Sequence, residues 1–211
     1  MSDRAAAAPA RGAPGAMLII ISGPSGVGKD TIIDALKRRS REPEYTFIVT
    51  CTTRAPRNGE VDGVDYRFLS TAAFAALRDS GELLEWADVH GHWYGTPRHE
   101  VVVALEAGHD VVLKIDVQGA QAVKQRVPYA LLIFVVPPSL ETLFARLRSR
   151  ATESADELEV RQRNAAIELA RQQDYDYVVV NETGQADRTA EQIDTIVAAE
   201  RTRHPRRRIR L

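Results

Sequence analysis

Residues 18–31 read LIIISGPSGVGKDT, and this stretch decides the fold. Its first part, Leu18 to Ile21, is an apolar, mostly β-branched run that ends in a Gly/Pro/Ser cluster, as is typical of a strand buried on both faces of a parallel sheet. A stretch with helical periodicity, Thr31 to Arg39, follows directly. A strand, a glycine-rich loop that ends in a lysine, and a helix, in this order, predict a phosphate-binding loop, or P-loop.

The loop itself suits a nucleoside triphosphate. Its glycines let the backbone wrap a phosphate, and its N–H groups and the helix N-terminus direct positive potential at that phosphate. Lys29 is placed to reach the β- and γ-phosphates. A plain glycine turn is the alternative, and the complete order of strand, loop, lysine and helix argues against it. We predict that ATP is bound by Gly23, Pro24, Ser25, Gly26, Val27, Gly28, Lys29, Asp30 and Thr31.

The expected metal ligand is where the loop departs from the usual pattern. The position after the lysine normally carries a Ser or Thr that binds Mg²⁺, whereas this chain has Asp30, with Thr31 one place later. A carboxylate is also a hard oxygen ligand. We therefore expect ATP to bind with Mg²⁺, and the metal ligand to be Asp30 or Thr31.

Further apolar runs of the same kind alternate with helical stretches. Strands are expected at residues 45–49, 111–115, 131–136 and 178–180, and helices at residues 98–107, 120–126, 140–150, 155–172 and 188–203. Strands that alternate with helices predict crossover connections and a parallel sheet covered on both faces. The expected fold class is α/β, with a P-loop NTPase-type parallel sheet flanked by helices.

We expect one domain at residues 17–203, with an extension at each end. Residues 1–16 are rich in Ala, Pro and Gly and are expected to be disordered, while residues 204–211 form a basic tail. Within the domain, residues 51–97 break the alternation and predict a small, mostly β insertion. An arginine-rich stretch at about residues 146–165 predicts a helical lid. The strand-like pieces of the insertion lie at residues 66–69 and 83–89.

The bulk composition gives no sign of a nucleic-acid or membrane partner for the chain as a whole. A formal net charge of -1 gives no chain-wide field that would attract nucleic acid or an anionic membrane. The chain shows neither a secretory signal nor a stretch of roughly 18 apolar residues, and its one cysteine, Cys51, fits a reducing compartment. We expect a cytoplasmic protein. RNA binding by the basic tail is the alternative to a solvated tail, and the solvated tail is favoured because a basic run without a partner fold is a weak motif.

A second segment carries a family resemblance. Residues 50–68, TCTTRAPRNGEVDGVDYRF, resemble the signature of guanylate kinases almost residue for residue. Further motifs similar to that family are LEWA at 84–87, WYGT at 93–96, IDVQG at 115–119 and DYVVVN at 176–181. The resemblance implies a kinase that transfers the γ-phosphoryl group of ATP to GMP, and also to dGMP, through a GMP-binding insertion and a lid.

The chemistry of this segment agrees with a guanine monophosphate. Arg54 and Arg57, three residues apart around a proline turn, can present two guanidinium groups to one phosphate dianion. Tyr66 and Tyr94 can donate hydroxyl hydrogen bonds to the same phosphate. Glu85 accepts only when ionised, so it can pair with the N1–H and the exocyclic amine of guanine, which adenine does not offer in that arrangement. A solvated charged turn is the alternative for the arginines.

The resemblance implies further site residues. It places Thr50 and Thr96 near the base, Glu60 and Asp116 at further acidic positions of the GMP pocket, and Asn181 near the adenine of ATP. Lid arginines are expected to neutralise the charge of the transferred phosphoryl group. A solvated helical face is the alternative, and we favour it for Arg148 and Arg163. The resulting catalytic candidates are Lys29, Arg54, Arg150 and Arg161, with Arg146 a weaker one.

A second departure from the family pattern lies at the end of a predicted strand, far from the P-loop in sequence. Two residues before Asp116 the family has an acid, and this chain has Lys114. Both Lys114 and Asp30 are expected at the carboxyl edge of the sheet, where ligands bind in open α/β folds. We hypothesise that the acid has moved to the loop and that Asp30 pairs with Lys114.

Two other functions compete with GMP phosphorylation. Some guanylate-kinase-like domains bind protein partners without catalysis, and these typically lose loop or lid residues that are intact here, such as Gly28 and Lys29. The Gly-Lys-Asp variant of the loop also resembles sugar-phosphate kinases, which makes another small phosphorylated substrate the second alternative. Arg54, Tyr66 and Glu85 favour GMP.

Overall fold

The computed structural model describes residues 15–39, 45–89, 91–149, 155–204, 209 and 211. Its centre is a parallel sheet with the strand order β2-β7-β1-β8-β9. These strands are β1 (Leu18–Ser22), β2 (Tyr45–Phe47), β7 (Asp110–Lys114), β8 (Leu131–Val136) and β9 (Tyr177–Val180). The P-loop therefore follows the central strand, as the apolar run at its start predicted.

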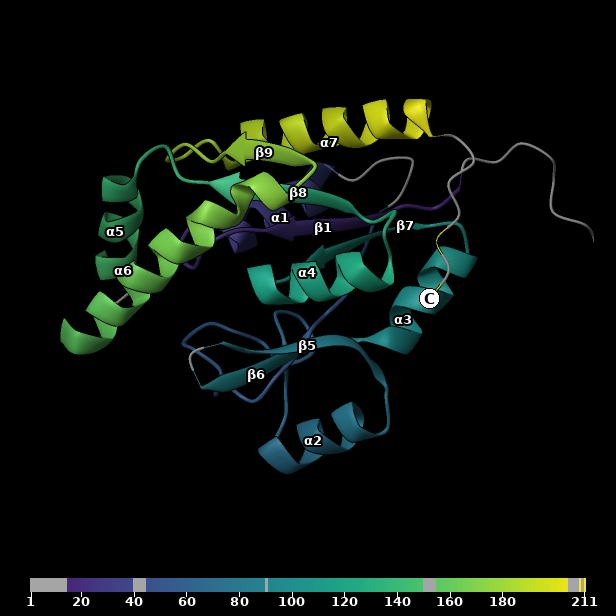
Figure 1. Ribbon diagram of the computed structural model, residues 1–211, viewed down its shortest axis with the longest axis horizontal. Helices are drawn as coiled ribbons and strands as arrows, with labels where there is room; N and C mark the ends of the chain where they lie inside the picture. The colour runs from purple at the N-terminus through teal and green to yellow at the C-terminus, as the bar shows by residue number, and fades with distance from the viewer. Residues whose placement is uncertain (1–14, 40–44, 90, 150–154, 205–208, 210) are drawn as a thin grey trace, which may run out of the picture.

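Helices cover both faces of this sheet (Figure 1). Side chains alternate along β1, so Ile19 and Ile21 pack in one hydrophobic cluster with α1 and α7, while Leu18 and Ile20 pack in another with α3 and α4. The helices are α1 (Lys29–Arg39), α3 (Arg98–Glu106), α4 (Val117–Arg126), α5 (Leu140–Ser149), α6 (Ala155–Leu169) and α7 (Ala186–Arg203), with a short 3₁₀ turn, η1 (Ala170–Asp174). The α/β fold with a parallel sheet and flanking helices is confirmed.

A second sheet lies below the first in Figure 1 and has the order β4-β3-β6-β5. Its strands are β3 (Cys51–Thr52), β4 (Arg67–Phe68), β5 (Leu83–Val89) and β6 (His92–Pro97), and α2 (Thr71–Asp79) packs beside it. The helix α2 was not expected from the sequence. Ser70 begins it by accepting a hydrogen bond from the N–H of Ala73, and Phe74 buries its side chain against the sheet.

Helix ends differ from the expected ones by up to three residues. α1 begins at Lys29, and α4 begins at Val117 because Asp116 caps it by accepting from Gln118 and Gly119 N–H. The expected disordered extension lies outside the described residues except for 15 and 16, and so do residues 205–208 and 210 of the basic tail. Among the described residues, no helix has both the length and the apolar character needed to cross a membrane.

Candidate active site

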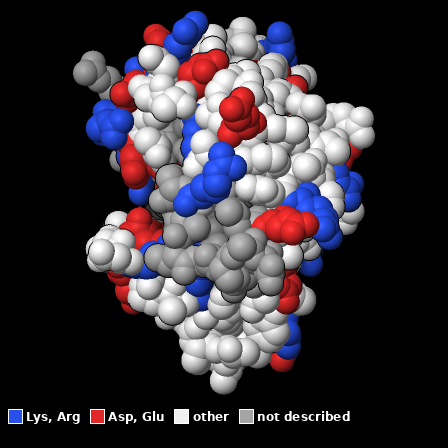
Figure 2. All heavy atoms as spheres, turned by 90° about the vertical axis from the view of Figure 1, so that its left-hand side faces the viewer, with Lys and Arg blue, Asp and Glu red and all other residues white. Residues whose placement is uncertain are grey.

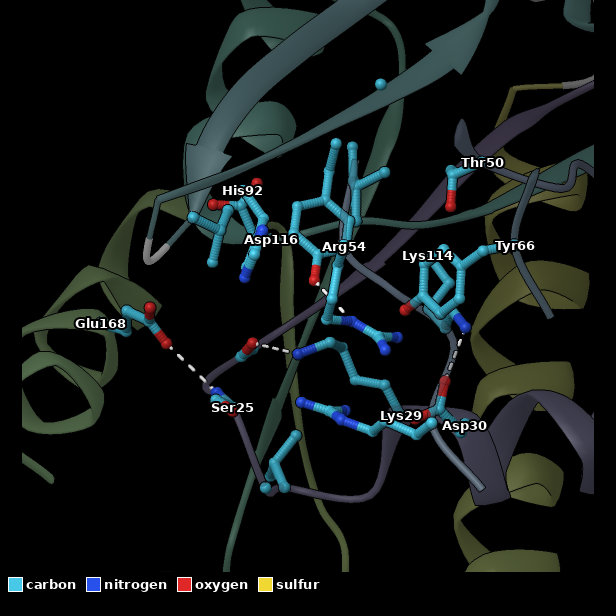
Figure 3. Close-up of a pocket in the computed structure, with 18 of the residues that line it drawn as sticks. Ser25, Lys29, Asp30, Thr50, Arg54, Tyr66, His92, Lys114, Asp116 and Glu168 are labelled. Atoms are coloured by element: carbon cyan, nitrogen blue, oxygen red, sulfur yellow. Dashed lines mark hydrogen bonds and ion pairs between the residues drawn. The ribbon is translucent and has the colours of Figure 1, made fainter. Parts of the chain in front are cut away.

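One cavity of about 780 Å³ lies between the carboxyl end of the parallel sheet and the second sheet (Figure 3). Residues of the P-loop line one side, and residues of the insertion line the other. The lining includes these predicted site residues: Gly23, Ser25, Gly26, Val27, Gly28, Lys29, Asp30, Thr50, Arg54, Arg57, Tyr66, Glu85, Tyr94 and Asp116. Segments more than 80 residues apart in sequence therefore share one site.

The P-loop is shaped by glycines in backbone conformations that other residues rarely adopt. Gly23 has φ +145, and a Cβ at this position would lie 2.3 Å from the carbonyl oxygen of Val135 on β8. Gly28 has φ +97, and its Cβ would lie 2.5 Å from Nδ2 of Asn181. Only glycine lets the loop lie this close to the strand and side chain behind it.

Lys29 is folded back over the loop. Its Nζ donates to the carbonyl oxygens of Gly23 at 2.5 Å and Pro24 at 3.1 Å. Burial lowers the pKa of Lys29, an effect that the carboxylates of Glu168, Asp30 and Asp116 oppose. The ammonium is therefore partly buried, and the nearby carboxylates favour its charged form.

Two side chains hold the loop from behind. Asn181, which is buried, donates from Nδ2 to the carbonyl oxygen of Val27 at 2.8 Å, and its Oδ1 accepts from Thr189. Arg146 of α5 donates to the same Val27 oxygen at 3.2 Å and to the carbonyl oxygen of Asn181 at 3.1 Å. In this structure both residues buttress the loop, and the expected contact of Asn181 with adenine stays a prediction.

On the opposite wall, Arg54 is held by several partners at once. Its two terminal nitrogens donate to the carboxylate of Glu60 at 2.9 and 2.8 Å, and Nε donates to the hydroxyl of Tyr94 at 3.1 Å. Burial opposes ionisation of Glu60, but the hydrogen bonds from Arg54 and from the Arg57 N–H, together with the charges of both arginines, hold the pKa of Glu60 below its usual value. Glu60 therefore orients Arg54 from outside the cavity lining.

Aromatic rings extend this wall. The guanidinium of Arg54 lies 5.4 Å from the ring centroid of Tyr66, and the rings of Tyr66 and Tyr94 meet edge to face at 5.9 Å. Arg57 also lines the cavity, and its backbone N–H donates to Glu60 at 2.6 Å. The two arginines and two tyrosines expected to share a phosphate are thus brought together.

Glu85 is a carboxyl group almost removed from water, with 3% of the residue exposed. Thr96, also fully buried, donates its hydroxyl to Oε1 at 2.6 Å. Burial raises the pKa of Glu85 to about 7, although the hydrogen bond from Thr96 lowers it. A Cβ at Gly119 would lie 2.6 Å from Oε2, so only a glycine at this position of α4 leaves room for the Glu85 carboxyl. Thr96 lies behind Glu85 and is not among the lining residues.

Besides Lys114, seven further lining residues were not predicted as site residues, and four of them also lie outside every motif quoted from the sequence: Val89, His92, Val160 and Glu168. Glu168, on α6, accepts a hydrogen bond from the backbone N–H of Ser25 at 3.2 Å across 143 positions of sequence (Figure 3). A glutamate in an amphipathic helix looks like an ordinary solvated residue, so the sequence held no signal for this contact. Burial raises the pKa of Glu168, and the charge of Lys29 opposes that rise.

Several expected residues lie elsewhere. Thr31 is exposed on α1, and neither it nor Pro24 is among the lining residues. The catalytic candidate Arg150 lies outside the described residues, and so does the side chain of Arg161, although α6 contains its backbone. Arg163 pairs with Glu159 on the exposed face of α6, as the solvated-face interpretation expected.

The hypothesised pair of Asp30 and Lys114 is confirmed. Lys114 Nζ donates to Oδ1 of Asp30 at 2.6 Å, and both residues line the cavity. Figure 2 shows the neighbouring face of the molecule, where basic and acidic side chains are intermingled and no large area of one sign stands out. On the face drawn in Figure 2, charge of either sign is thus not gathered into a large patch.

Comparisons with known proteins agree with this geometry. A family model described as guanylate kinase matches residues 15–200. A guanylate kinase of Mycobacterium sp. (strain MCS) is 51% identical over 166 residues, which are 78% of this chain and 83% of that one. A guanylate kinase of Gloeobacter violaceus is 50% identical over 179 residues, 85% of this chain and 86% of that one.

Among solved structures, the guanylate kinase from Anaplasma phagocytophilum is 32% identical and has a TM-score of 0.71, covering 90% of this chain and 88% of its own. The family model and this solved relative each match most of the chain. The chain belongs to the guanylate kinase family.

Proposed function

We propose that this protein transfers the γ-phosphoryl group of ATP to GMP, forming ADP and GDP, and that dGMP is a second acceptor. The observation that carries the proposal is the composition of one cavity, which has a phosphate loop on one wall and the buried carboxyl of Glu85 with the Arg54 cluster on the other. Its membership of the guanylate kinase family supports the same reaction. A nucleotide kinase of this kind is expected to act in the cytoplasm.

The acceptor would be held at both ends. Arg54 and Arg57, with Tyr66 and Tyr94, provide donors for the GMP phosphate, and Glu85 provides an acceptor for the guanine N1–H and amine. Thr96 fixes the direction of the Glu85 carboxyl through its hydrogen bond. AMP would leave the Glu85 carboxylate without these donors, which is costly in a buried site.

No covalent intermediate or general base is required. A phosphate oxygen of GMP is already a nucleophile, so rate enhancement comes from in-line positioning and from positive charge around the transferred group. On the donor wall, the loop N–H groups and Lys29 hold the β- and γ-phosphates. Arg150 and Arg161 are the proposed lid arginines for this charge.

Mg²⁺ would bind chiefly through the phosphates of ATP. The part of the chain that the structure describes contains no cluster of three or more His, Cys, Asp or Glu side chains suited to a metal. Asp30 and Thr31, at the start of α1, supply hard oxygen donors of the kind that Mg²⁺ prefers and are the candidate protein ligands. When bound, the ion would neutralise charge on the transferred phosphoryl group.

The test measures ADP release with GMP, dGMP, AMP and UMP as acceptors. We expect turnover with GMP and dGMP and little with AMP or UMP. Turnover with none of them would refute the kinase and favour the alternative of a protein-binding module. Preference for a different phosphorylated acceptor would favour the second alternative, a related small-molecule kinase.

A further inference from the structure

Lys114 links the two walls of the cavity. It is the last residue of β7, and its Nζ lies 2.6 Å from Oδ1 of Asp30 and 4.4 Å from the ring centroid of Tyr66 (Figure 3). Only 17% of the Lys114 side chain is exposed, whereas 58% of the Asp30 side chain is. The ammonium is therefore enclosed where the donor and acceptor walls meet.

On the donor wall, the contact reaches the base of the P-loop. Asp30 is the second residue of α1 and follows Lys29 directly, so its carboxylate lies at the helix N-terminus, where negative charge is stabilised. The ion pair with Lys114 joins this helix to the end of the neighbouring strand β7. Because Asp30 is next to Lys29 in sequence, this ion pair fixes the P-loop lysine relative to the end of β7.

On the acceptor wall, the same ammonium lies against the ring of Tyr66, one of the residues proposed to bind the GMP phosphate. The Tyr66 ring that faces Lys114 also faces the guanidinium of Arg54 at 5.4 Å. A cation above an aromatic ring is attracted to it, most strongly when little water intervenes. A continuous set of contacts therefore runs from Asp30 through Lys114 and Tyr66 to Arg54.

We propose that Lys114 is a positioning residue for phosphoryl transfer, which sets the acceptor-phosphate side chains against the donor loop. Asp30 holds the Lys114 ammonium in place, and the ammonium in turn positions the ring of Tyr66. In-line transfer depends on the separation and angle of two bound phosphates, and a misplacement of about 1 Å costs on the order of 100-fold in rate. This inference rests on the proposed GMP kinase activity.

The experiment compares Lys114→Met with Lys114→Arg and with the control Lys124→Met. Lys124 also pairs with an aspartate, Asp176, at 3.0 Å, and it is not among the residues that line the cavity. Each variant is checked by circular dichroism and thermal unfolding. The kinetic parameters kcat and KM are measured for both nucleotides, and calorimetry gives the dissociation constants of GMP and ADP separately.

We expect Lys114→Met to lower kcat by about 10- to 100-fold, because alignment in the ternary complex is lost. The separate dissociation constants of GMP and ADP should change by less than about threefold, since Lys29 and Arg54 still bind their phosphates. Lys114→Arg, which retains the charge, should keep kcat within about threefold, and Lys124→Met should leave kcat unchanged. If Lys114 served folding alone, Lys114→Met would lower the unfolding temperature, and kcat would not fall while the dissociation constants of GMP and ADP stay nearly unchanged.

Asp30→Asn tests the anchor. Alone it should lower kcat, and in the Lys114→Met background it should lower kcat by a clearly smaller factor, because the ion pair is already lost there and only other roles of Asp30, such as a metal contact, remain to be removed. Additive losses would overturn the anchoring role, and an unchanged kcat in a folded Lys114→Met would overturn the whole inference. If Lys114→Met does not fold, loss of kcat in a folded Lys114→Arg overturns it. Wild-type turnover is measured first, because its absence refutes the proposed function itself.

Discussion

The two walls of the cavity are built in different ways. The donor wall is formed mainly by one stretch, from Gly23 to Asp30, whose backbone conformation makes the site. The acceptor wall is assembled from side chains between Thr50 and Asp116 that reach the cavity from several strands and loops. A backbone site recognises charge, which many nucleotides share, whereas a side-chain site recognises the arrangement of donors and acceptors on one base. The acceptor wall therefore carries the specificity.

The strongest test of the backbone-built wall is Gly23→Ala. The new Cβ would lie 2.3 Å from a backbone carbonyl of β8 at φ +145, so neither partner can move easily. We expect a loss of about 3 kcal/mol in the free energy of unfolding and a large rise in the KM for ATP. Gly184→Ala is the control, since no described atom lies within 4 Å of its Cβ at φ +75. Equal losses in both variants would contradict the role of close packing.

Arg54→Gln tests the side-chain wall. Loss of a charge-assisted donor set should raise the KM for GMP by about 10- to 100-fold, because each such hydrogen bond is worth about 1.5–3 kcal/mol. The KM for ATP should stay nearly constant, since Arg54 lies opposite the P-loop. Steady-state kinetics with each nucleotide varied in turn checks this. A parallel rise in both KM values would mean that the two walls do not act separately.

The pH dependence of GMP recognition tests Glu85. Its pKa is raised to about 7, so the carboxylate that accepts from guanine is present above about pH 7 and is lost as the pH falls below it. We expect kcat/KM for GMP to fall about tenfold per pH unit below that point. The phosphate of GMP also titrates near pH 6, so Glu85→Gln, which has a lower kcat/KM but shares the substrate, is the control. The same steep fall in this variant would show that the substrate alone titrates.

The smallest effect is expected for Asn181→Ala, which removes one support of the donor loop. Its hydrogen bond to the Val27 carbonyl is worth about 1 kcal/mol, and Arg146 still donates to the same oxygen. The KM for ATP should rise about fivefold, with the KM for GMP unchanged. Direct titration of ADP and of GMP separates the two, and weaker GMP binding would argue against a role confined to the donor wall.

Much of the fold could be predicted because its signals are local. The five strands of the parallel sheet are short apolar runs, and the flanking helices show helical periodicity. The insertion was harder. The sequence from Thr71 reads TAAFAALRD and forms α2, a short helix that the capping serine before it is too weak a signal to predict. In the same insertion, β3 has only two residues, and β6 contains Gly95 and Pro97. Such short elements owe their form to tertiary contacts.

The site residues were identified from motifs, and their partners were not. The loop and the Arg54 to Tyr66 segment are readable as patterns, but the bidentate Glu60 contact, the place of Asn181 behind the loop and the Glu168 contact depend on side chains meeting in space. The pairing of Asp30 with Lys114 is the exception. It was predictable because both residues depart from the family pattern at the same edge of the sheet.

The sequence by itself determined the phosphate loop, the parallel sheet and the residue types of the acceptor wall, because each depends on neighbours along the chain. Only the tertiary structure decided how the two walls face each other. It removed Glu85 from water, which raised its pKa, and it enclosed Lys114 between Asp30 and Tyr66. Burial and charge interactions depend on three-dimensional distance, and residues 84 positions apart, such as Asp30 and Lys114, acquire that distance only when the chain folds.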